Sequence, residues 1–570
     1  MTQQLTDHLL FLYGEELATK IYPRLVELMA RYRQKLKVAP VKPVTYFDEQ
    51  DCVLITYGDM VQEAGTPPLD TLANFLEQTV KGVINTVHLL PFYPYSSDDG
   101  FSVIDYKQVD PNLGSWENVA RFGRSFELMF DAVVNHISSE SHWFQGFLRD
   151  ESPYKDYFTV VQAGTDLSQV FRPRELPLLT EVETVTGQRQ VWTTFSADQI
   201  DLNYANPELL LEVVEILLFY VSHGARFIRL DAIAFIWKEI DTSCIHLPQA
   251  HRIIQLLRSV LDEVAPDVVL ITETNVPHKD NISYFGDGIN EAQMVYNFSL
   301  PPLTLHAFHT GNAQTLSRWA ATLSQPSEAT TFFNFLASHD GIGVTPARDL
   351  LSDIEIANMA RRVEALGGYV SYRTALDGSK RAYELNINYL DALGDADQTG
   401  QDPEIVAMRF IASQAIMLAL RGVPGIYFHS LFGSHNWLEG VKQTGRKRSI
   451  NRQRLQRNRL EAELANSGSL RQRVFSSYCR LLKARAADPA FHPNGDQIVL
   501  DLNPAIFAVQ RTSPDALSTV FCVQNVSAES LHIRLPVRNS ALKELVGGKT
   551  HRSDDLRVRP YEVLWLRHSA

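Results

Sequence analysis

A positive and a negative side chain interrupt an apolar run at residues 227–235, FIRLDAIAF. Arg229 and Asp231 stand two positions apart, so on a strand they point to the same face. Charged side chains are rarely buried unless they are paired. The run therefore predicts either a structural ion pair or a strand that ends at a site where an anion is held beside a cation.

Other ionisable or polar residues stand where further apolar runs end. The carboxyl ends of parallel strands meet at one edge of a sheet, and barrel enzymes place their chemistry there. These residues are Asp59, His88, Asp131, Asn135, His136, Glu273, His339 and Asp340. We expect several carboxylates to converge on one mouth together with Arg229 and Asp231.

Convergent carboxylates suit the cleavage of a glycoside with retention of configuration. One carboxylate attacks the sugar carbon, while a second carboxyl group protonates the leaving oxygen and later acts as a base. Arg229 would favour the ionised form of Asp231, and Glu273 in a less cationic environment would stay protonated. Structural explanations stay open for each part alone: a buried ion pair, a solvated strand end for Glu273, and a turn or helix cap for His339–Asp340.

Eight apolar runs that alternate with helical patterns must position these residues. They cover residues 52–57, 83–92, 126–134, 226–233, 268–274, 294–300, 330–338 and 423–429. Amphipathic stretches such as 209–224 and 251–266 separate them. Strands that alternate with helices predict a parallel sheet, and eight of them predict an α/β fold of the closed (β/α)8 barrel type.

Four segments do not follow this alternation. Residues 1–45 carry an apolar stripe with helical spacing and predict an N-terminal helical extension. Sequence rich in Pro, Thr and Asp predicts inserted subdomains at 137–198 and 341–403. Short apolar runs predict a C-terminal β domain at 491–570. The ranges left for the barrel are 46–136, 199–340 and 404–490.

The composition limits the classes of function. The chain has 570 residues, 45% hydrophobic and 21% charged, which is enough for a large core with appended domains. The net charge of −13 argues against a nucleic-acid partner. Four scattered cysteines favour a reducing compartment over a disulfide framework. With neither a signal peptide nor an apolar run of membrane-spanning length, a cytoplasmic protein without a membrane partner is expected.

Four motifs resemble, in order and spacing, the core motifs of the alpha-amylase family. They are DAVVNH at 131–136, RFIRLDA at 226–232, ITE at 271–273 and ASHDG at 337–341.

This resemblance implies a role for each of the residues singled out above. Asp231 would be the nucleophile, Glu273 the acid/base and Asp340 the stabiliser of the transition state. Arg229 would orient the nucleophile. The residues implied to hold the bound glucosyl unit are His136 and His339.

A closer resemblance, to the sucrose phosphorylase branch, covers nearly the whole chain. It rests on stretches such as LITYGD, HLLPFYPYSSDDGFSVIDY, FRPRELP, DAIAFIWKEIDTSCIHL and INR. Phe195 would stack near the covalent intermediate. The residues implied to hold the non-reducing glucosyl group are Asp59, His88 and Arg448. Arg174 and Tyr383 match residues that help to bind phosphate, although Arg174 without this match would read as a solvated loop residue.

The resemblance also bears on metals. Asn135 matches a calcium ligand of amylases, but sucrose phosphorylases do without calcium, so no metal is expected.

The chain departs from sucrose phosphorylases on the side where the acceptor would bind. Arg381 and Glu384 in the loop KRAYELN replace the Asp and Gln that sucrose enzymes usually carry. An arginine there could grip a carboxylate. His278 and Lys279 follow the acid/base, and the N-terminal extension is a further difference. These features resemble glucosylglycerate phosphorylases, whose second substrate is glycerate.

The resemblance implies a retaining phosphorylase that forms α-D-glucose 1-phosphate and D-glycerate through a β-glucosyl enzyme. Inorganic phosphate would be a co-substrate, and no cofactor is expected. The expected partners are a small sugar substrate and phosphate, with a homodimer left open.

Several alternatives remain. The same chemistry could use sucrose, sucrose 6′-phosphate or glucosylglycerol, or water could take the glucosyl unit in a hydrolase. A non-catalytic amylase-like protein would predict a broken catalytic set, whereas Asp231, Glu273 and Asp340 are all present.

Overall fold

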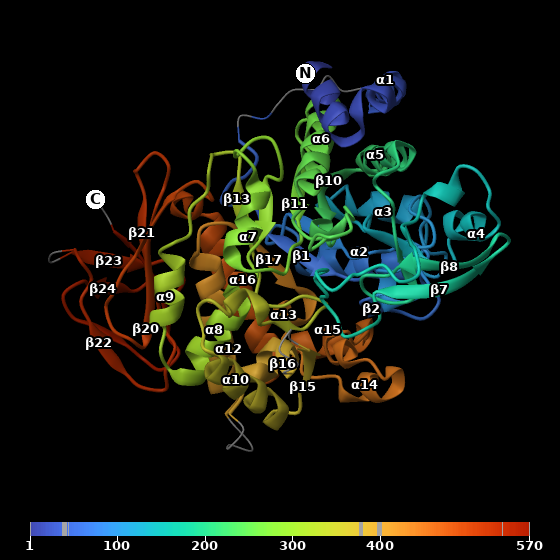
Figure 1. Cartoon of the computed structure of the whole chain (residues 1–570). Coiled ribbons are helices and arrows are strands. Elements are labelled where there is room, and N and C mark those ends of the chain that lie inside the picture. Colours follow the sequence, from blue (N-terminus) through green and yellow to red (C-terminus); the bar gives the residue numbers. More distant parts are fainter. Residues whose placement is uncertain are drawn as a thin grey trace.

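A closed barrel of eight parallel strands forms the centre of the computed structural model (Figure 1). The structure describes residues 2–36, 43, 45–374, 380–395, 402–537 and 540–568. Around the barrel the strands follow in the order β1, β3, β4, β10, β11, β12, β13 and β17. Their bounds are Val53–Thr56, Thr86–Leu89, Glu127–Ala132, Ala225–Leu230, Val269–Thr272, Met294–Tyr296, Thr331–Asn334 and Val423–Tyr427. Each strand overlaps one predicted run, so the predicted (β/α)8 fold is confirmed.

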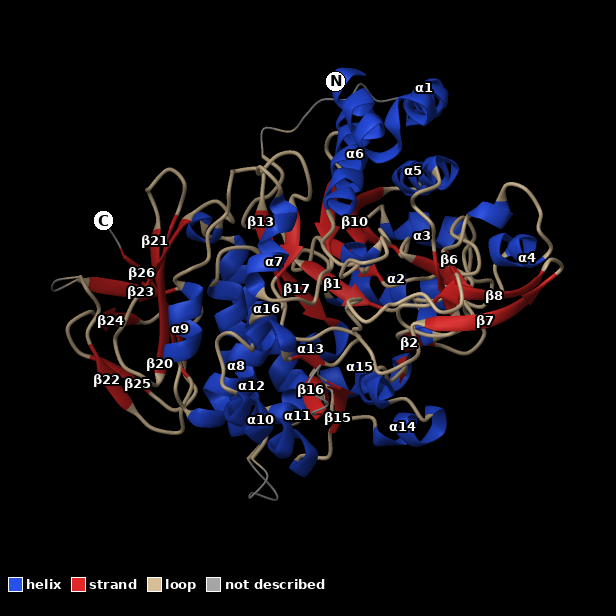
Figure 2. Cartoon of the chain, in the orientation of Figure 1, coloured by secondary structure: helices blue, strands red, loops and turns tan. Residues whose placement is uncertain are grey.

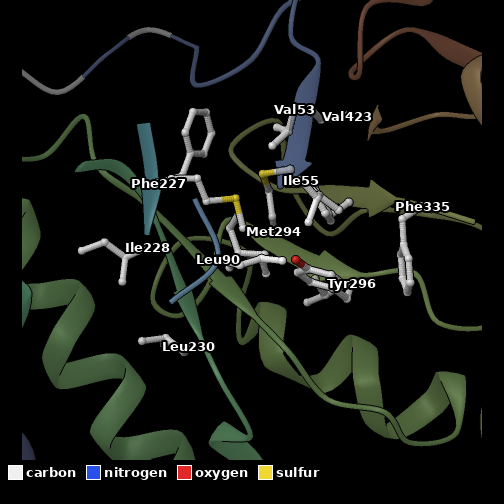
Figure 3. Close-up of a cluster of buried hydrophobic side chains, with 14 of the residues drawn as sticks. Val53, Ile55, Leu90, Phe227, Ile228, Leu230, Met294, Tyr296, Phe335 and Val423 are labelled. Atoms are coloured by element: carbon white, nitrogen blue, oxygen red, sulfur yellow. The ribbon is translucent and has the colours of Figure 1, made fainter. Parts of the chain in front are cut away.

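Burial explains why these strands are apolar. Every residue of β1, β3, β11 and β13 is buried. Figure 3 shows buried apolar side chains such as Val53, Phe227 and Met294 gathered from β1, β10 and β12. Parallel strands covered by helices face the core on both sides, so they form continuous apolar runs rather than alternating ones.

Helices surround the barrel. α5 (Pro207–Ser222) and α6 (Pro248–Val264) occupy the two amphipathic stretches singled out in the sequence. Asn206 caps α5 by accepting the backbone N–H of Glu208 at 3.0 Å, and Pro207 opens the helix, where a missing N–H costs nothing. The other helices after the N-terminal one and outside the inserted segments are α2 (Pro68–Thr79), α3 (Trp116–Phe122), α7 (His278–Ile282), α8 (Leu300–Thr310), α9 (Gln314–Ala320), α12 (Pro403–Ala419), α13 (Phe428–Leu431), α14 (Leu438–Thr444), α15 (Arg457–Ala465) and α16 (Leu470–Ala486).

The N-terminal extension is the helix α1 (Thr2–Leu36), which lies against α5 and α6 (Figure 1). Leu9 and Leu25 are buried in the main core. Gly14 has φ 72°, which interrupts the helical path. Of the predicted extension at 1–45, residues 1, 37–42 and 44 lie outside the described residues.

Two inserted segments contain small sheets that the sequence did not predict. After β4, β5 (His136–Ser138) pairs with β9 (Gln199–Asp201). The same segment contains the helix α4 (His142–Leu148). It also contains a three-stranded sheet in the order β6 (Val160–Val161), β8 (Gly187–Trp192) and β7 (Leu179–Thr184). After β13, β14 (Ile342–Gly343), β16 (Lys380–Asn386) and β15 (Tyr369–Thr374) form another, beside α10 (Asp353–Ala365) and α11 (Tyr389–Ala392). A short pair, β2 (Val61–Gln62) and β18 (Leu455–Gln456), lies outside both.

The C-terminal part forms a separate antiparallel sheet, seen as red strands at the left of Figure 2. Six strands lie in the order β19 (Asp496–Val499), β20 (Ile506–Thr512), β21 (Thr519–Asn525), β26 (Val563–His568), β23 (Ala541–Glu544) and β24 (Thr550–Arg552), and β22 (Leu531–Ile533) pairs with β25 (Leu556–Val558). The short apolar runs QIVLDL, IFAVQR, STVFCVQNV, LHIRL and EVLWLR overlap β19, β20, β21, β22 and β26. The sequence analysis missed β23, β24 and β25, which are short and rich in charged residues.

Among the described residues, no helix combines the length and the apolar composition that crossing a bilayer requires. The four cysteines are all unpaired, and three of them are buried.

Candidate active site

Arg229 lies at the centre of an ion-pair network at the base of the barrel mouth. β4 and β10 are neighbours, and their register places Arg229 beside Asp131. Arg229 Nη1 lies 2.5 Å from Asp131 Oδ1 and 2.7 Å from Asp231 Oδ1. His88 on β3 lies 2.7 Å from the other oxygen of Asp131. The network therefore ties three neighbouring strands together and is more than an isolated ion pair.

Asp231 directly follows the last residue of β10. Burial raises the pKa of the Asp231 carboxyl above its ordinary value, and Arg229 and His136 oppose that rise. Arg229 lowers the pKa of Asp231, as the sequence indicates, but burial raises that pKa by more. Arg229 is thus the main group that opposes the effect of burial on the pKa of Asp231.

The chain turns sharply after Asp231. Ala232 has φ 50°, a left-handed conformation that costs a residue other than glycine about 1–3 kcal/mol. In this conformation the backbone N–H of Ala232 donates to Glu273 Oε2 at 3.1 Å. The turn therefore ties Glu273, at the end of β11, to the segment that carries Asp231.

Glu273 differs from Asp231 in its electrostatic surroundings. Its Oε2 lies 3.9 Å from Arg229 Nη2, whereas Asp231 lies 2.7 Å from the same guanidinium. Burial raises the pKa of Glu273 to about 7, Asp231 and Asp340 add to the rise, and Arg229 opposes it. Near neutral pH much of Glu273 is protonated, which suits a general acid.

Asp340 follows β13 and lies between two arginines. Arg448 Nη1 is 2.5 Å and Arg452 Nη2 is 3.3 Å from its Oδ1. Burial alone would raise the pKa of Asp340, but Arg448, His339 and Arg452 outweigh it and hold the pKa well below its usual range. Asp340 is therefore a fixed negative charge. The His339 ring stacks on Phe101 with the ring centroids 4.7 Å apart.

The three carboxyl groups face one cavity of about 130 Å³. Aromatic rings form part of its wall: Phe195 lies 5.3 Å from His136 and 5.5 Å from Phe235, measured between ring centroids. The Arg174 guanidinium lies 5.4 Å from the Phe195 ring centroid and 3.6 Å from Asp98 Oδ2. The predicted site residues that line this cavity are His136, Arg174, Phe195, Asp231, Glu273, His339, Asp340, Tyr383 and Arg448.

Two residues predicted to hold the glucosyl group, Asp59 and His88, lie outside that lining. His88 belongs to the buried network, and Asp59 Oδ1 lies 2.8 Å from Arg454 Nε. Arg452 contacts both Asp99 and Asp340. Arg452 and Arg454 were not predicted as site residues, although the tripeptide INR ends at Arg452.

β16 carries the acceptor-side residues predicted in KRAYELN. Tyr383 lines the cavity and also, with Glu384, a neighbouring one of about 520 Å³. Glu384 Oε1 lies 2.9 Å from Arg448 Nη2 and accepts the backbone N–H of Gly341 at 3.1 Å. Arg381 lines neither cavity, and its Nη1 lies 3.9 Å from Asp353 Oδ2.

His278 and Lys279 lie at the start of α7, away from the cavity lining. The His278 ring is 6.1 Å from Phe332 and 6.2 Å from Trp319, measured between centroids. Asn275, earlier in the same loop, does line the cavity. The acceptor role predicted for His278 and Lys279 therefore gains nothing from this geometry.

Comparison with known proteins identifies the family of this chain. Residues 79–345 match the alpha-amylase catalytic domain. A glucosylglycerate phosphorylase of Allomeiothermus silvanus is 47% identical over 566 residues, which are 99% of this chain and 98% of that protein. The chain belongs to the alpha-amylase family. Within that family, a sucrose phosphorylase of Bifidobacterium adolescentis is 30% identical over 70% of this chain and 79% of its own length. The crystal structure of sucrose 6F-phosphate phosphorylase from Thermoanaerobacter thermosaccharolyticum shares the fold, with a TM-score of 0.74, 23% identity and coverage of 89% of this chain and 98% of that one.

Asn135 is the residue that matches a calcium ligand in amylases of the alpha-amylase family. Here it accepts from a lysine: Lys238 Nζ lies 3.0 Å from Asn135 Oδ1, 2.7 Å from Asp201 Oδ2 and 2.6 Å from the Phe235 carbonyl. The buried ammonium thus occupies the oxygen cluster in which a cation would sit, and these residues do not fit a calcium ion. Across the described residues, no group of three or more His, Cys, Asp or Glu side chains is arranged to hold a metal.

Proposed function

We propose that this chain is a retaining phosphorylase that converts 2-O-α-D-glucosyl-D-glycerate and phosphate reversibly to α-D-glucose 1-phosphate and D-glycerate. The observation that carries the proposal is the 47% identity, over 99% of the chain, to a protein named glucosylglycerate phosphorylase. The sucrose phosphorylase is 30% identical and spans 70% of the chain. The comparison therefore favours glycerate over fructose as the second product.

In the first step, Asp231 attacks C1 of the α-glucosyl group. The bond from C1 to the glycerate oxygen breaks, and Glu273 gives its proton to that oxygen. The product is a β-glucosyl ester on Asp231. Arg229, 2.7 Å from Asp231, aligns the nucleophile, and the fixed charge of Asp340 stabilises the positive charge that develops on the sugar ring.

In the second step, phosphate enters the space that glycerate has left. Ionised Glu273 accepts the phosphate proton as a phosphate oxygen attacks C1, and the ester bond to Asp231 breaks. Two inversions retain the α configuration. The proposed reaction needs no cofactor, because phosphate itself is the second reactant. We assign phosphate binding to Arg174 and Tyr383. The glucosyl unit is assigned to the cavity-lining residues His136, Phe195, His339 and Arg448. Asp59 and His88, which lie outside that lining, stay predictions from the resemblance.

Phosphate and glycerate are both anions and must use the acceptor side in turn. We propose that Arg381 and Tyr383 on β16, in the predicted acceptor segment 376–386, take part in this exchange. Residues 376–379 of that segment lie outside the described residues. Arg381→Ala should weaken transfer to glycerate more than it weakens formation of the glucosyl enzyme from glucose 1-phosphate. Equal losses in the two reactions would contradict this exchange role.

The test of the proposed function is the release of glucose 1-phosphate from phosphate and a set of donors compared side by side. The donors are 2-O-α-glucosylglycerate, sucrose, sucrose 6′-phosphate and glucosylglycerol. We expect release from glucosylglycerate and little from the others. Release mainly from another donor would keep the mechanism and change the acceptor, whereas glucose formed equally well without phosphate would mean a hydrolase.

We propose a cytoplasmic location, with the sugar substrate and phosphate as the partners. All four cysteines are unpaired, and free thiols persist in reducing compartments.

A further inference from the structure

Arg373 is a cavity-lining arginine that the sequence analysis did not single out. It lies on β15, and its side chain reaches the cavity that Asp231, Glu273 and Asp340 also line. Its guanidinium lies 5.8 Å from the Phe171 ring centroid. Its Nε atom is buried and has no hydrogen-bond partner. A buried donor without a partner is costly, so this atom marks a place where a ligand atom would be accepted.

The other two arginines of the cavity wall already have carboxylate partners. Arg174 lies 3.6 Å from Asp98, and Arg448 lies 2.5 Å from Asp340 and 2.9 Å from Glu384. Among the described residues, no carboxylate lies within ion-pair distance of Arg373. Of the three arginines in the cavity wall, Arg373 is therefore the one whose charge is available to pair with a bound anion.

The surroundings of Arg373 add positive charge. In the antiparallel β15–β16 pair, Arg373 stands directly opposite Arg381, and like charges in that position repel. Asp353 lies 2.9 Å from Arg348 and 3.9 Å from Arg381, so it offsets those two arginines. Burial lowers the pKa of Arg373, and Arg348 and Arg381 lower it further. A bound anion would offset both the cost of burying the Arg373 charge and its repulsion by Arg348 and Arg381.

We infer that Arg373 binds the anionic group of the second substrate, the carboxylate of glycerate or a phosphate oxygen, in this cavity. This inference rests on the proposed function for the identity of the two anions. The planar guanidinium suits a carboxylate or a phosphate, because it can donate two parallel hydrogen bonds. Arg381 stands opposite it on β16 but does not line the cavity.

The experiment compares Arg373→Gln with Arg361→Gln, which removes the same charge from an exposed position on α10, outside the cavity. Each variant receives α-D-glucosyl fluoride as donor and either D-glycerate or uncharged glycerol as acceptor. We expect Arg373→Gln to raise the KM for glycerate about 10- to 100-fold and to change transfer to glycerol about twofold or less. Arg361→Gln should match the wild type, and Arg373→Lys should recover part of the loss.

A second arm separates the two anions by measuring the KM for phosphate in phosphorolysis of whichever donor the wild type uses. A rise for both phosphate and glycerate assigns Arg373 to a shared anion site, and a rise for glycerate alone assigns it to the carboxylate. Equal losses for glycerate and glycerol, or no change in either KM, would overturn the inference. Failure of the proposed function would appear separately, as a wild type that uses another donor.

Discussion

Formation of the glucosyl enzyme should slow above neutral pH, because in the proposed mechanism Glu273 must carry a proton to release the acceptor. Burial raises its pKa to about 7, with Asp231 and Asp340 adding to the rise. A carboxyl group is protonated below its pKa and ionised above it, so the acid is present at low pH and is lost as the pH rises. We expect the rate of this step to be level below about pH 6 and to fall about tenfold for each pH unit above about pH 8.

The size of the effect follows from the surroundings of Glu273. A pKa raised from 4.5 to about 7 corresponds to a preference of about 3 kcal/mol for the neutral form. At pH 7 a glutamate of ordinary pKa would be protonated to roughly 0.3%, whereas Glu273 would be protonated to roughly a half. Its position therefore increases the population of the acid about 150-fold.

The assay is rapid-quench measurement of glycerate release from 2-O-α-glucosylglycerate without phosphate, across the pH range. α-D-Glucosyl fluoride is the matched donor, because fluoride leaves without a proton from Glu273. Glu273→Gln should slow glycerate release about 10²- to 10⁴-fold and fluoride release far less. If both donors show the same loss of rate at high pH, the loss reports another group and the role given to Glu273 is wrong.

Two further predictions concern the nucleophile and the buried lysine. Asp231→Asn should lower turnover of every donor about 10⁴-fold or more while the circular dichroism spectrum stays unchanged; appreciable turnover in a sample free of wild type would rule out Asp231 as nucleophile. Lys238→Met should lower the free energy of unfolding by about 3–5 kcal/mol, because it leaves the Asp201 carboxylate buried without its cation. Adding Asp201→Asn should recover part of that loss in urea unfolding, and a single variant as stable as the wild type would refute the reasoning.

Much of the barrel could be predicted because its strands are buried on both faces. VLIT at Val269–Thr272 reads as a strand without any knowledge of its neighbours, since every side chain is apolar or small and buried. The strands of the first insert, LTEVET and GQRQVW, are mostly polar, and most of their residues are exposed or only partly buried. They become strands by pairing with each other, which short-range pattern does not report.

The residues of the candidate site also fall into two groups, those that the sequence predicts and those whose positions depend on the folded chain. Asp231 and Glu273 could be placed from the sequence because each follows a barrel strand whose end fixes its position. Arg452 and Arg454 lie in the segment between α14 and β18, and the course of that segment decides which of them meets Asp59 and which meets Asp340. The pKa of Asp231 also depends on how far the folded chain excludes water, which no local pattern contains.

The side chain of Lys238 holds together three segments of the chain that an exchangeable ion could otherwise have connected. A divalent cation held by the oxygens of Asn135, Asp201 and Phe235 would be in equilibrium with the solution, and phosphate would compete for it. The ammonium arrives with the chain and cannot dissociate. The protein can therefore work in high concentrations of its proposed anionic reactant without losing the charge that fixes the loop after β4, and a chelator could not remove that charge.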